Sequence, residues 1–389
     1  MIALKYVKLH SVDRTIRGKI MKRISSTNLF VIVSTLVALS LSIEASWAQS
    51  TGQRDAVEQS RGKVPLPPWG SGDELGMANA IGSGTWGRCA WHLNQKGAKS
   101  YEISHIRSNT MPQSPFGIPL KYEYTPTKSI PYSKHAFNDE VLKSGQPGAQ
   151  GTQMDALGHF AVLPELWKGK GPVPSDKAKY YGGYTQKEVK PSPSSPLLKL
   201  GIEKVPPIVT SAVLLDARAY LGGGEPMKDG AVITAKNIDA MIKAQGLEWR
   251  GILPGDVLYI YTGWSDNWSD PDMAKVYYSM GPGLSFDAAK YIQKKGVTLL
   301  ALDNPFTDPA AKGMIFGKAP PAKGTPPGLP FAVHHYNLSV SGIHQIQNAN
   351  LKALAADKVW TSCTIILPLR SKGGAGSPVR PVAIGVPQE

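Results

Sequence analysis

The chain has 389 residues, which is long enough to fold around one large hydrophobic core or to divide into two. Its formal net charge is +14 at pH 7, but the basic residues are scattered and form no run with interleaved aromatic residues. This distribution argues against nucleic acid and favours a small anionic ligand or an acidic surface as partner. The sequence also lacks the GxSxG, HExxH and GxGxxG patterns of serine hydrolases, zinc proteases and dinucleotide oxidoreductases.

The first 48 residues have the pattern of a secretion signal. Three basic residues within 19–23 precede an apolar run from Leu29 to Leu41, and the small residues Ser46 and Ala48 follow. A membrane anchor is the alternative, but the run is shorter than the ~20 residues that cross a bilayer. We therefore predict cleavage after Ala48 and a periplasmic or secreted protein without a stable membrane span. Met21 is an alternative start, because the residues before it form an unusually long polar lead.

The next part of the chain favours irregular structure. Residues 49–68 are polar and end in a proline-rich stretch, which predicts a flexible leader. Residues 69–138 are rich in proline, glycine and aromatic residues and predict loops and short strands. Proline and glycine clusters at 169–174 and 191–196 predict long surface loops, and another at 310–328 predicts an insertion or a lid.

The second half of the chain alternates predicted strands and helices. Two helices are indicated by Thr234 and Ser285 as N-caps and by Gly246 and Gly296 directly after their ends. This alternation predicts a layered α/β domain. The expected helices cover 234–245 and 285–295, and the expected strands cover 212–216, 256–262, 297–303 and 361–367.

The chain has two cysteines, Cys89 and Cys363. A chain exported to an oxidising compartment can pair them. Two buried thiols are the alternative, and neither cysteine lies in a CxxC motif. The sequence leaves both possibilities open.

The stretch from Gly151 to His159, GTQMDALGH, places a carboxylate and an imidazole four residues apart. On a helix, this spacing brings Asp155 and His159 to one face, with their Cβ atoms about 5–6 Å apart. Ions such as Zn²⁺ and Mn²⁺ accept oxygen and nitrogen ligands of this kind. A structural Asp–His hydrogen bond is the alternative interpretation.

Six segments in consistent order resemble the cyclase family, which includes bacterial kynurenine formamidase and isatin hydrolase. The resemblance implies one α/β domain over residues 69–389 with the family's swivelling β/β/α fold, and a homo-oligomer. It also implies a hydrolase that cleaves an amide, formamide or cyclic lactam C–N bond with metal-activated water. The segments are WGSGDELGMAN at 69–79, GTQMDALGH at 151–159, DVLYIYTGW at 256–264, GPGLS at 281–285, VTLLALDN at 297–304 and GSPVRPVAI at 376–384.

The family's metal ligands are only partly present in this chain. The signature HxxxHxDxxxH aligns with Ala149, Gln153, Asp155 and His159, so two of its four positions are kept. The family's second ligand segment, a His followed twelve residues later by a Glu, aligns with His335 and Gln347. The resemblance therefore implies one divalent ion, Zn²⁺ or Mn²⁺, and the ligands that it implies are Asp155, His159 and His335, with Gln153 as a weak oxygen donor.

Asp155, His159 and His335 are also the predicted catalytic residues, because a neutral imidazole can act as general base near pH 7. Adjacent residues of a strand point to opposite faces, so His334 is predicted to lie on the surface. Asp303 lies at the carboxyl end of a predicted strand, where α/β folds collect their sites, and a structural turn is the alternative. Trp264 lies in the loop after the predicted strand 256–262 and is a candidate for lining an aromatic pocket, with simple loop packing as the alternative. The predicted substrate-binding residues are Gln153, Gln347, Trp264 and Asp303.

Three functions remain open at this point. The first is a metal-assisted hydrolase of a small molecule. The second is a family member without metal or chemistry that serves as a periplasmic small-molecule binding protein, which the replacements at Ala149, Gln153 and Gln347 favour. The third keeps catalysis without metal and uses Asp155 and His159 as an acid–base pair.

Overall fold

The computed structural model describes residues 51–388. By packing, the chain divides into residues 1–54 and 55–389, so the account below concerns the second unit. The predicted signal peptide lies outside the described residues. Residues 51–60 are helical, which differs from the flexible leader expected over 49–68. The reason is packing, because Val57 and Ser60 are buried in the domain.

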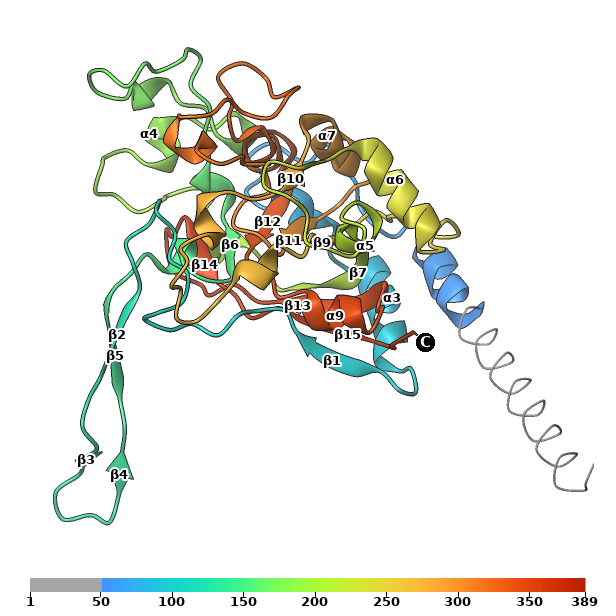
Figure 1. The fold of residues 1–389 in the computed structure, drawn as a ribbon, viewed down its shortest axis with the longest axis horizontal. Helices are drawn as coiled ribbons and strands as arrows, with labels where there is room; N and C mark the ends of the chain where they lie inside the picture. Colours follow the sequence, from blue (N-terminus) through green and yellow to red (C-terminus); the bar gives the residue numbers. More distant parts are fainter. Residues whose placement is uncertain (1–50, 389) are drawn as a thin grey trace, which may run out of the picture. The chain divides into compact units, whose positions relative to one another are not determined.

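One nine-stranded mixed sheet forms the centre of the domain and confirms the predicted α/β class (Figure 1). Its four central strands, β7, β9, β11 and β12, run parallel, while the strands on both sides pair antiparallel. All residues of β9 and β11 are buried, which explains their uninterrupted apolar sequences. In sheet order the strands are β1 (Lys99–Glu102), β15 (Val382–Gly385), β13 (Thr361–Ile366), β7 (Ile208–Asp216), β9 (Val257–Tyr261), β11 (Leu299–Leu302), β12 (His344–Gln347), β6 (Gln153–Asp155) and β14 (Gly376–Pro378).

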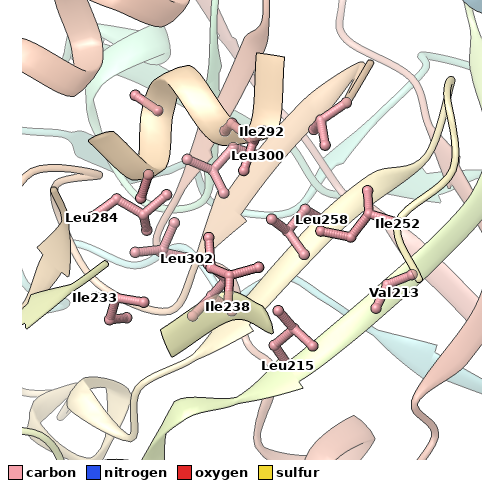
Figure 2. Close-up of a cluster of buried hydrophobic side chains, with 14 of the residues drawn as sticks. Val213, Leu215, Ile233, Ile238, Ile252, Leu258, Leu284, Ile292, Leu300 and Leu302 are labelled. Carbon is pink, nitrogen blue, oxygen red and sulfur yellow. The ribbon is translucent and has the colours of Figure 1, made fainter. Parts of the chain in front are cut away.

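Helices α6 (Ala235–Ala244) and α7 (Phe286–Lys294) cover one face of this sheet, as the caps predicted. The Thr234 hydroxyl accepts a hydrogen bond from the backbone N–H of Asn237, and Ser285 caps α7 in the same way. Their apolar faces pack on the strands, for example Ile238 and Ile292 beside Leu258 and Leu300 (Figure 2). Each fully buried aliphatic side chain of this kind contributes about 1.5–3 kcal/mol of transfer free energy.

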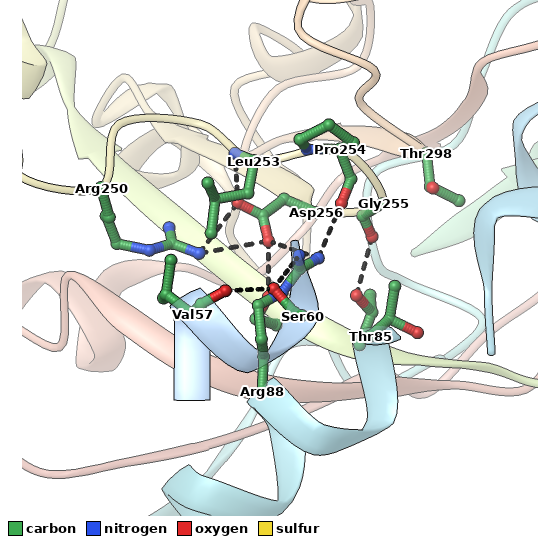
Figure 3. A network of polar contacts seen from close by, with 12 residues as sticks. Val57, Ser60, Thr85, Arg88, Arg250, Leu253, Pro254, Gly255, Asp256 and Thr298 are labelled. Atoms are coloured by element: carbon green, nitrogen blue, oxygen red, sulfur yellow. Dashed lines mark hydrogen bonds and ion pairs between the residues drawn. The ribbon is translucent and has the colours of Figure 1, made fainter. Parts of the chain in front are cut away.

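Helix α3 (Ser83–Leu93) lies against β7 and β13 and is fixed there by two kinds of contact. Cys89 forms a disulfide with Cys363 of β13, which resolves the alternatives that the sequence left open. Arg88 donates from Nε to Ser211 of β7, and its Nη2 lies 3.4 Å from the carboxylate of Asp256. Arg250 pairs with the same carboxylate at 3.0 Å (Figure 3). Asp256 is fully buried, so its two arginines are needed to compensate its charge.

A two-stranded arm projects from the domain between residues 121 and 144 (Figure 1). Strand β2 (Lys121–Tyr124) pairs with β5 (Glu140–Ser144), and β3 (Lys128–Ser129) pairs with β4 (Ala136–Phe137). This agrees with the loops and short strands expected before residue 138. The arm exposes several large apolar side chains, and the homo-oligomer implied by the family resemblance stays a prediction.

The remaining elements are short, and none of the helices in residues 51–388 has the length and apolarity to span a bilayer. The interval 310–328, expected to be an insertion or lid, is a loop that holds one turn of 3₁₀ helix at Met314–Phe316. Further elements are β8 (Val232–Ile233), β10 (Gly283–Leu284), α4 (Gln186–Val189), α5 (Ala217–Tyr220), α8 (Ala332–His334), α9 (Lys352–Ala356), the 3₁₀ helices η3 (Leu157–His159) and η7 (Trp264–Asn267), and the π-helix η10 (His335–Ser341).

Candidate functional site

Strands β6 and β12 form the floor of the candidate site. Their antiparallel register pairs Gln153 with Gln347 and Asp155 with Gln345. Because side chains alternate along a strand, these four residues share one face, while the fully buried Met154 and Ile346 point into the core on the other. The motif around Asp155 therefore lies on a strand and not on the helix that its spacing suggested.

A cavity of about 250 Å³ opens above this floor. Its lining combines polar groups at the base with several aromatic rings. Phe306 and Phe331 lie 5.8 Å apart between ring centroids, and Phe116 lies 6.1 Å from both. The lining residues are Ser114, Phe116, Gln146, Ala149, Gln153, Asp155, His159, Phe160, Tyr278, Pro305, Phe306, Phe331, His334 and Gln347.

His334, predicted to lie on the surface, is buried in this cavity wall, and the prediction was wrong. Its Nδ1 lies 2.6 Å from Oδ2 of Asp308, and its Nε2 lies 3.2 Å from Nε2 of Gln347 and 3.8 Å from Oδ2 of Asp155. His334 ends helix α8, which continues directly into η10. The argument from strand alternation therefore does not apply to this segment.

His335 lies instead in a neighbouring cavity of about 380 Å³, between residues 160–167 and 327–331. It is half-buried, and its Nδ1 has no hydrogen-bond partner among the described residues. Burial lowers the pKa of His335, which the charge of Asp308 only partly offsets. The structure therefore does not place His335 with Asp155 and His159, as the predicted site required, and His334 lines their cavity instead.

Asp308 holds His334 in place, and sequence reasoning missed it. Its carboxylate accepts hydrogen bonds from the backbone N–H groups of Val333 at 2.6 Å and of His334 at 3.1 Å. Burial lowers the pKa of His334, but the hydrogen bond and charge of Asp308, with the charge of Asp155, outweigh burial and raise this pKa above its usual value. The only signal in the sequence was an acidic residue shortly after the Asp303–Asn304 strand end.

Gln347 connects the two charged groups of the floor. Its Nε2 donates a hydrogen bond to Oδ2 of Asp155 at 2.6 Å, which fixes the orientation of the amide because an ionised carboxylate only accepts. The other end of the amide, Oε1, is buried and has no partner among residues 51–388. Gln345 shares this face but does not line the cavity. Its Oε1 accepts hydrogen bonds from Thr307 and Asn337.

His159 and Gln153 line the cavity as predicted. His159 ends η3 and is exposed, so it lies at the rim and not at the base. Gln153 is partly exposed, and its Oε1 is a buried atom without a hydrogen-bond partner in the described part of the chain.

Trp264 and Asp303, predicted to bind substrate, do not line this cavity. Trp264 packs on Tyr277 and Tyr278, which agrees with the alternative of simple packing. The Asp303 carboxylate accepts from the backbone and hydroxyl of Thr262, both at 2.7 Å, and from Ser265. Burial raises the pKa of Asp303 even though these hydrogen bonds oppose the shift. Asp303 thus fixes the turn at the start of η7.

The residues at this site do not fit the divalent metal that the sequence implied. Positions 149, 153 and 347, where the family pattern has two imidazoles and a carboxylate, carry a methyl group and two neutral amides. Within residues 51–388, no three His, Cys, Asp or Glu side chains are placed to hold a metal ion. The predicted ligands are not brought together, because Asp155 and His159 line one cavity and His335 lines another.

Comparison with known proteins identifies the family. The Cyclase family model ("Putative cyclase") matches residues 83–309, which is more than half of the chain. The chain belongs to the cyclase family. The crystal structure of a novel cyclase matches it with a TM-score of 0.63 and 22% identity over 81% of this chain and 97% of that chain, which confirms the cyclase fold.

Two other solved structures are similar to a lesser degree. Isatin hydrolase A from Ralstonia solanacearum has a TM-score of 0.48 and 18% identity, covering 74% of this chain and 92% of its own. A structure described as a potential metal-dependent hydrolase with cyclase activity has a TM-score of 0.40 and 15% identity, covering 74% and 98%. No curated protein sequence matches the chain.

Proposed function

We propose that this cyclase-family protein is a hydrolase that cleaves an amide, formamide or cyclic lactam C–N bond, with His334 as the general base. The observation that carries the proposal is the Asp308–His334 pair, whose Nδ1–Oδ2 distance is 2.6 Å, in the wall of a cavity with a second carboxylate. A base oriented by a carboxylate is the usual arrangement for activating a nucleophile.

In the proposed reaction, the two ring nitrogen atoms of His334 have different roles. Nδ1–H of neutral His334 donates to Asp308, which leaves the Nε2 lone pair facing Gln347 and Asp155. Nε2 takes a proton from water as the water oxygen bonds to the substrate carbonyl carbon. The proton then passes to the substrate nitrogen as the C–N bond breaks, giving a carboxylic acid and an amine. Asp155 stabilises the imidazolium that forms between these steps.

A binding protein without chemistry is the second candidate, and one contact favours it. The amide of Gln347 lies 3.2 Å from Nε2 of His334, so it occupies the lone pair that a general base needs. Substrate must displace this contact for hydrolysis to occur.

The two candidates differ in turnover. We expect chelator-treated protein to hydrolyse members of a panel of N-formyl arylamines, anilides and lactams, and His334→Gln to lower kcat/KM by about 10²–10⁴-fold. His335→Gln is the matched control, because it removes the adjacent imidazole from a different cavity. Saturable ligand binding without turnover by any panel member would support the binding protein.

We also propose that the mature chain is exported. The basic and apolar pattern before Ala48 supports this localisation, and so does the Cys89–Cys363 disulfide, since disulfides persist in oxidising compartments.

A further inference from the structure

Two buried acceptors at the polar base of the cavity lack hydrogen-bond partners in the described residues. Gln347 is 1% exposed, its amide nitrogen contacts Asp155 and His334, and its carbonyl oxygen Oε1 is buried without a partner in residues 51–388. Gln153, its cross-strand partner, likewise has an Oε1 atom without a partner in residues 51–388. Buried carbonyl oxygens that lack donors carry a free-energy cost, so a ligand with N–H groups gains by meeting them.

These acceptors lie together because of the strand register. Gln153 and Gln347 are directly paired, and side chains of such a pair have Cβ atoms about 4.5–5.5 Å apart. Asp155 lies two residues along β6 on the same face and is already bonded to Gln347. The carboxylate of Asp155 and the amides of Gln153 and Gln347 therefore lie together on one face of the cavity floor.

The charged groups of the cavity lining also favour a positively charged ligand. The fourteen lining residues include no lysine or arginine, although the whole chain has a net charge of +14. His334 has Asp308 as its close partner at 2.6 Å, whereas Asp155 lies 3.8 Å from the same ring and is bonded to a neutral amide. The anionic ligand that the overall charge suggested is thus poorly matched to this cavity, and a cation is better matched.

Above this base, the cavity is aromatic. The rings of Phe116, Phe306 and Phe331 pack edge-on or tilted with centroids 5.8–6.1 Å apart, and the ring of Phe160 lies 5.6 Å from that of His334. Aromatic faces bind both apolar bodies and organic cations. A volume of about 250 Å³ limits the ligand to a small molecule.

We propose that this cavity binds a primary ammonium group carried by a small apolar or aromatic body. An ammonium has three N–H donors, and the floor of the cavity supplies acceptors from three residues, the carboxylate of Asp155 and the amide oxygens of Gln153 and Gln347. The body of the ligand packs among the phenylalanine rings. The inference deepens the proposed function, because it names the ligand class of the same cavity, but it concerns binding and does not require turnover.

The test is calorimetric titration of the chelator-treated protein with three probes of one shape. These are 2-phenylethylamine as the cation, 2-phenylethanol as the neutral analogue and phenylacetate as the anion. We expect the amine to bind at least 10-fold more tightly than the alcohol, and phenylacetate to bind more weakly than either. Equal affinity for amine and alcohol, preference for the anion, or no amine binding at millimolar concentration would overturn the proposal.

Substitutions at the cavity floor test whether Asp155 and Gln347 bind the ammonium group. Asp155→Asn should weaken amine binding at least 10-fold and leave alcohol binding nearly unchanged, whereas Glu248→Gln, the same charge change at an exposed position, should alter neither. Gln347→Glu should strengthen amine binding, which keeps the test valid if Asp155→Asn does not fold. Phe116→Leu should weaken amine and alcohol alike, since it removes a ring from the apolar part. Amine affinity that none of the polar variants alters would contradict the assigned position.

The outcomes for binding and for hydrolysis are separate. Tight amine binding with no turnover of any amide would leave this inference standing and remove the proposed function. Hydrolysis of neutral amides with no preference for the amine would keep the proposed function and overturn this inference.

Discussion

The Nε2 atom of Gln347 lies 2.6 Å from Oδ2 of Asp155, so a neutral amide donates to the carboxylate at the position where the family pattern has a second carboxylate. The two residues are 192 positions apart and meet through the pairing of β6 with β12. The contact gives Asp155 one hydrogen-bond donor and leaves the carbonyl oxygen of Gln347 without a partner among residues 51–388.

We expect purified protein to hold less than one equivalent of Zn²⁺ or Mn²⁺ and to lose it to a chelator. The variant Ala149→His/Gln153→His/Gln347→Glu should bind a divalent ion tightly, because it replaces a methyl group and two amides with charged and imidazole ligands. Elemental analysis after gel filtration measures both. Two firmly bound zinc ions in the unmodified protein would show that the argument from the donor set is wrong.

The pH dependence of turnover reports on the Asp308–His334 pair. A general base must be deprotonated, and the pKa of His334 is raised above its usual 6.5, so kcat/KM should rise with pH through an apparent pKa above 6.5. Asp308→Asn removes the hydrogen-bonding and charge effects that raise this pKa, so the limb should move to lower pH while the maximal rate falls. A pH profile that Asp308→Asn leaves in place would contradict a positioning role for Asp308.

Stability should fall as the pH decreases from 6.5 toward 4. Burial lowers the pKa of His105 to about 4 and, with the charge of Arg250, lowers that of His92 to about 3. The unfolded chain binds protons at these histidines below pH 6.5 and the folded chain does not, so each contributes on the order of 3 kcal/mol that is lost over this range. Urea unfolding between pH 7.5 and 4.5 measures the loss. His105→Gln should reduce the slope, and an unchanged slope would count against the assignment.

The buried ion cluster of Figure 3 should be important for folding stability. Asp256→Asn leaves Arg88 and Arg250 buried without their counter-charge and should lower the free energy of unfolding by about 3–5 kcal/mol. The matched control is Glu102→Gln, which removes the exposed partner of Arg380 and should cost less than about 1 kcal/mol. Similar denaturation midpoints for the two variants would show that the cluster adds little.

Export is tested on protein taken from the cell envelope. Mass spectrometry should find an N-terminus at Gln49 and, without reductant, a mass two hydrogens lower than the reduced chain because Cys89 and Cys363 are paired. An intact Met1 or Met21 form held in the membrane would contradict cleavage after Ala48.

The sequence alone determined the regular part of the fold and the floor of the site. Thr234 and Ser285 predict the starts of helices α6 and α7, because a capping side chain bonds to the backbone of its own turn. The apolar runs of β9 and β11 predict buried strands, because a strand that is buried on both faces has no position for a polar side chain. Gln153, Asp155, His159 and Gln347 were found at the cavity because they stand at positions of a family motif.

Tertiary structure alone decided which histidine faces the cavity and what it contacts. His334 and His335 are adjacent, and only the rotation of α8 and η10 on the sheet turns one ring to Asp308 and the other into a separate cavity. The phenylalanine rings of the rim come from segments up to 215 residues apart, Phe116 and Phe331 among them. Local sequence patterns report the period of an element and its ends, but contacts between distant segments depend on how whole elements pack, and those contacts determine the chemistry of this site.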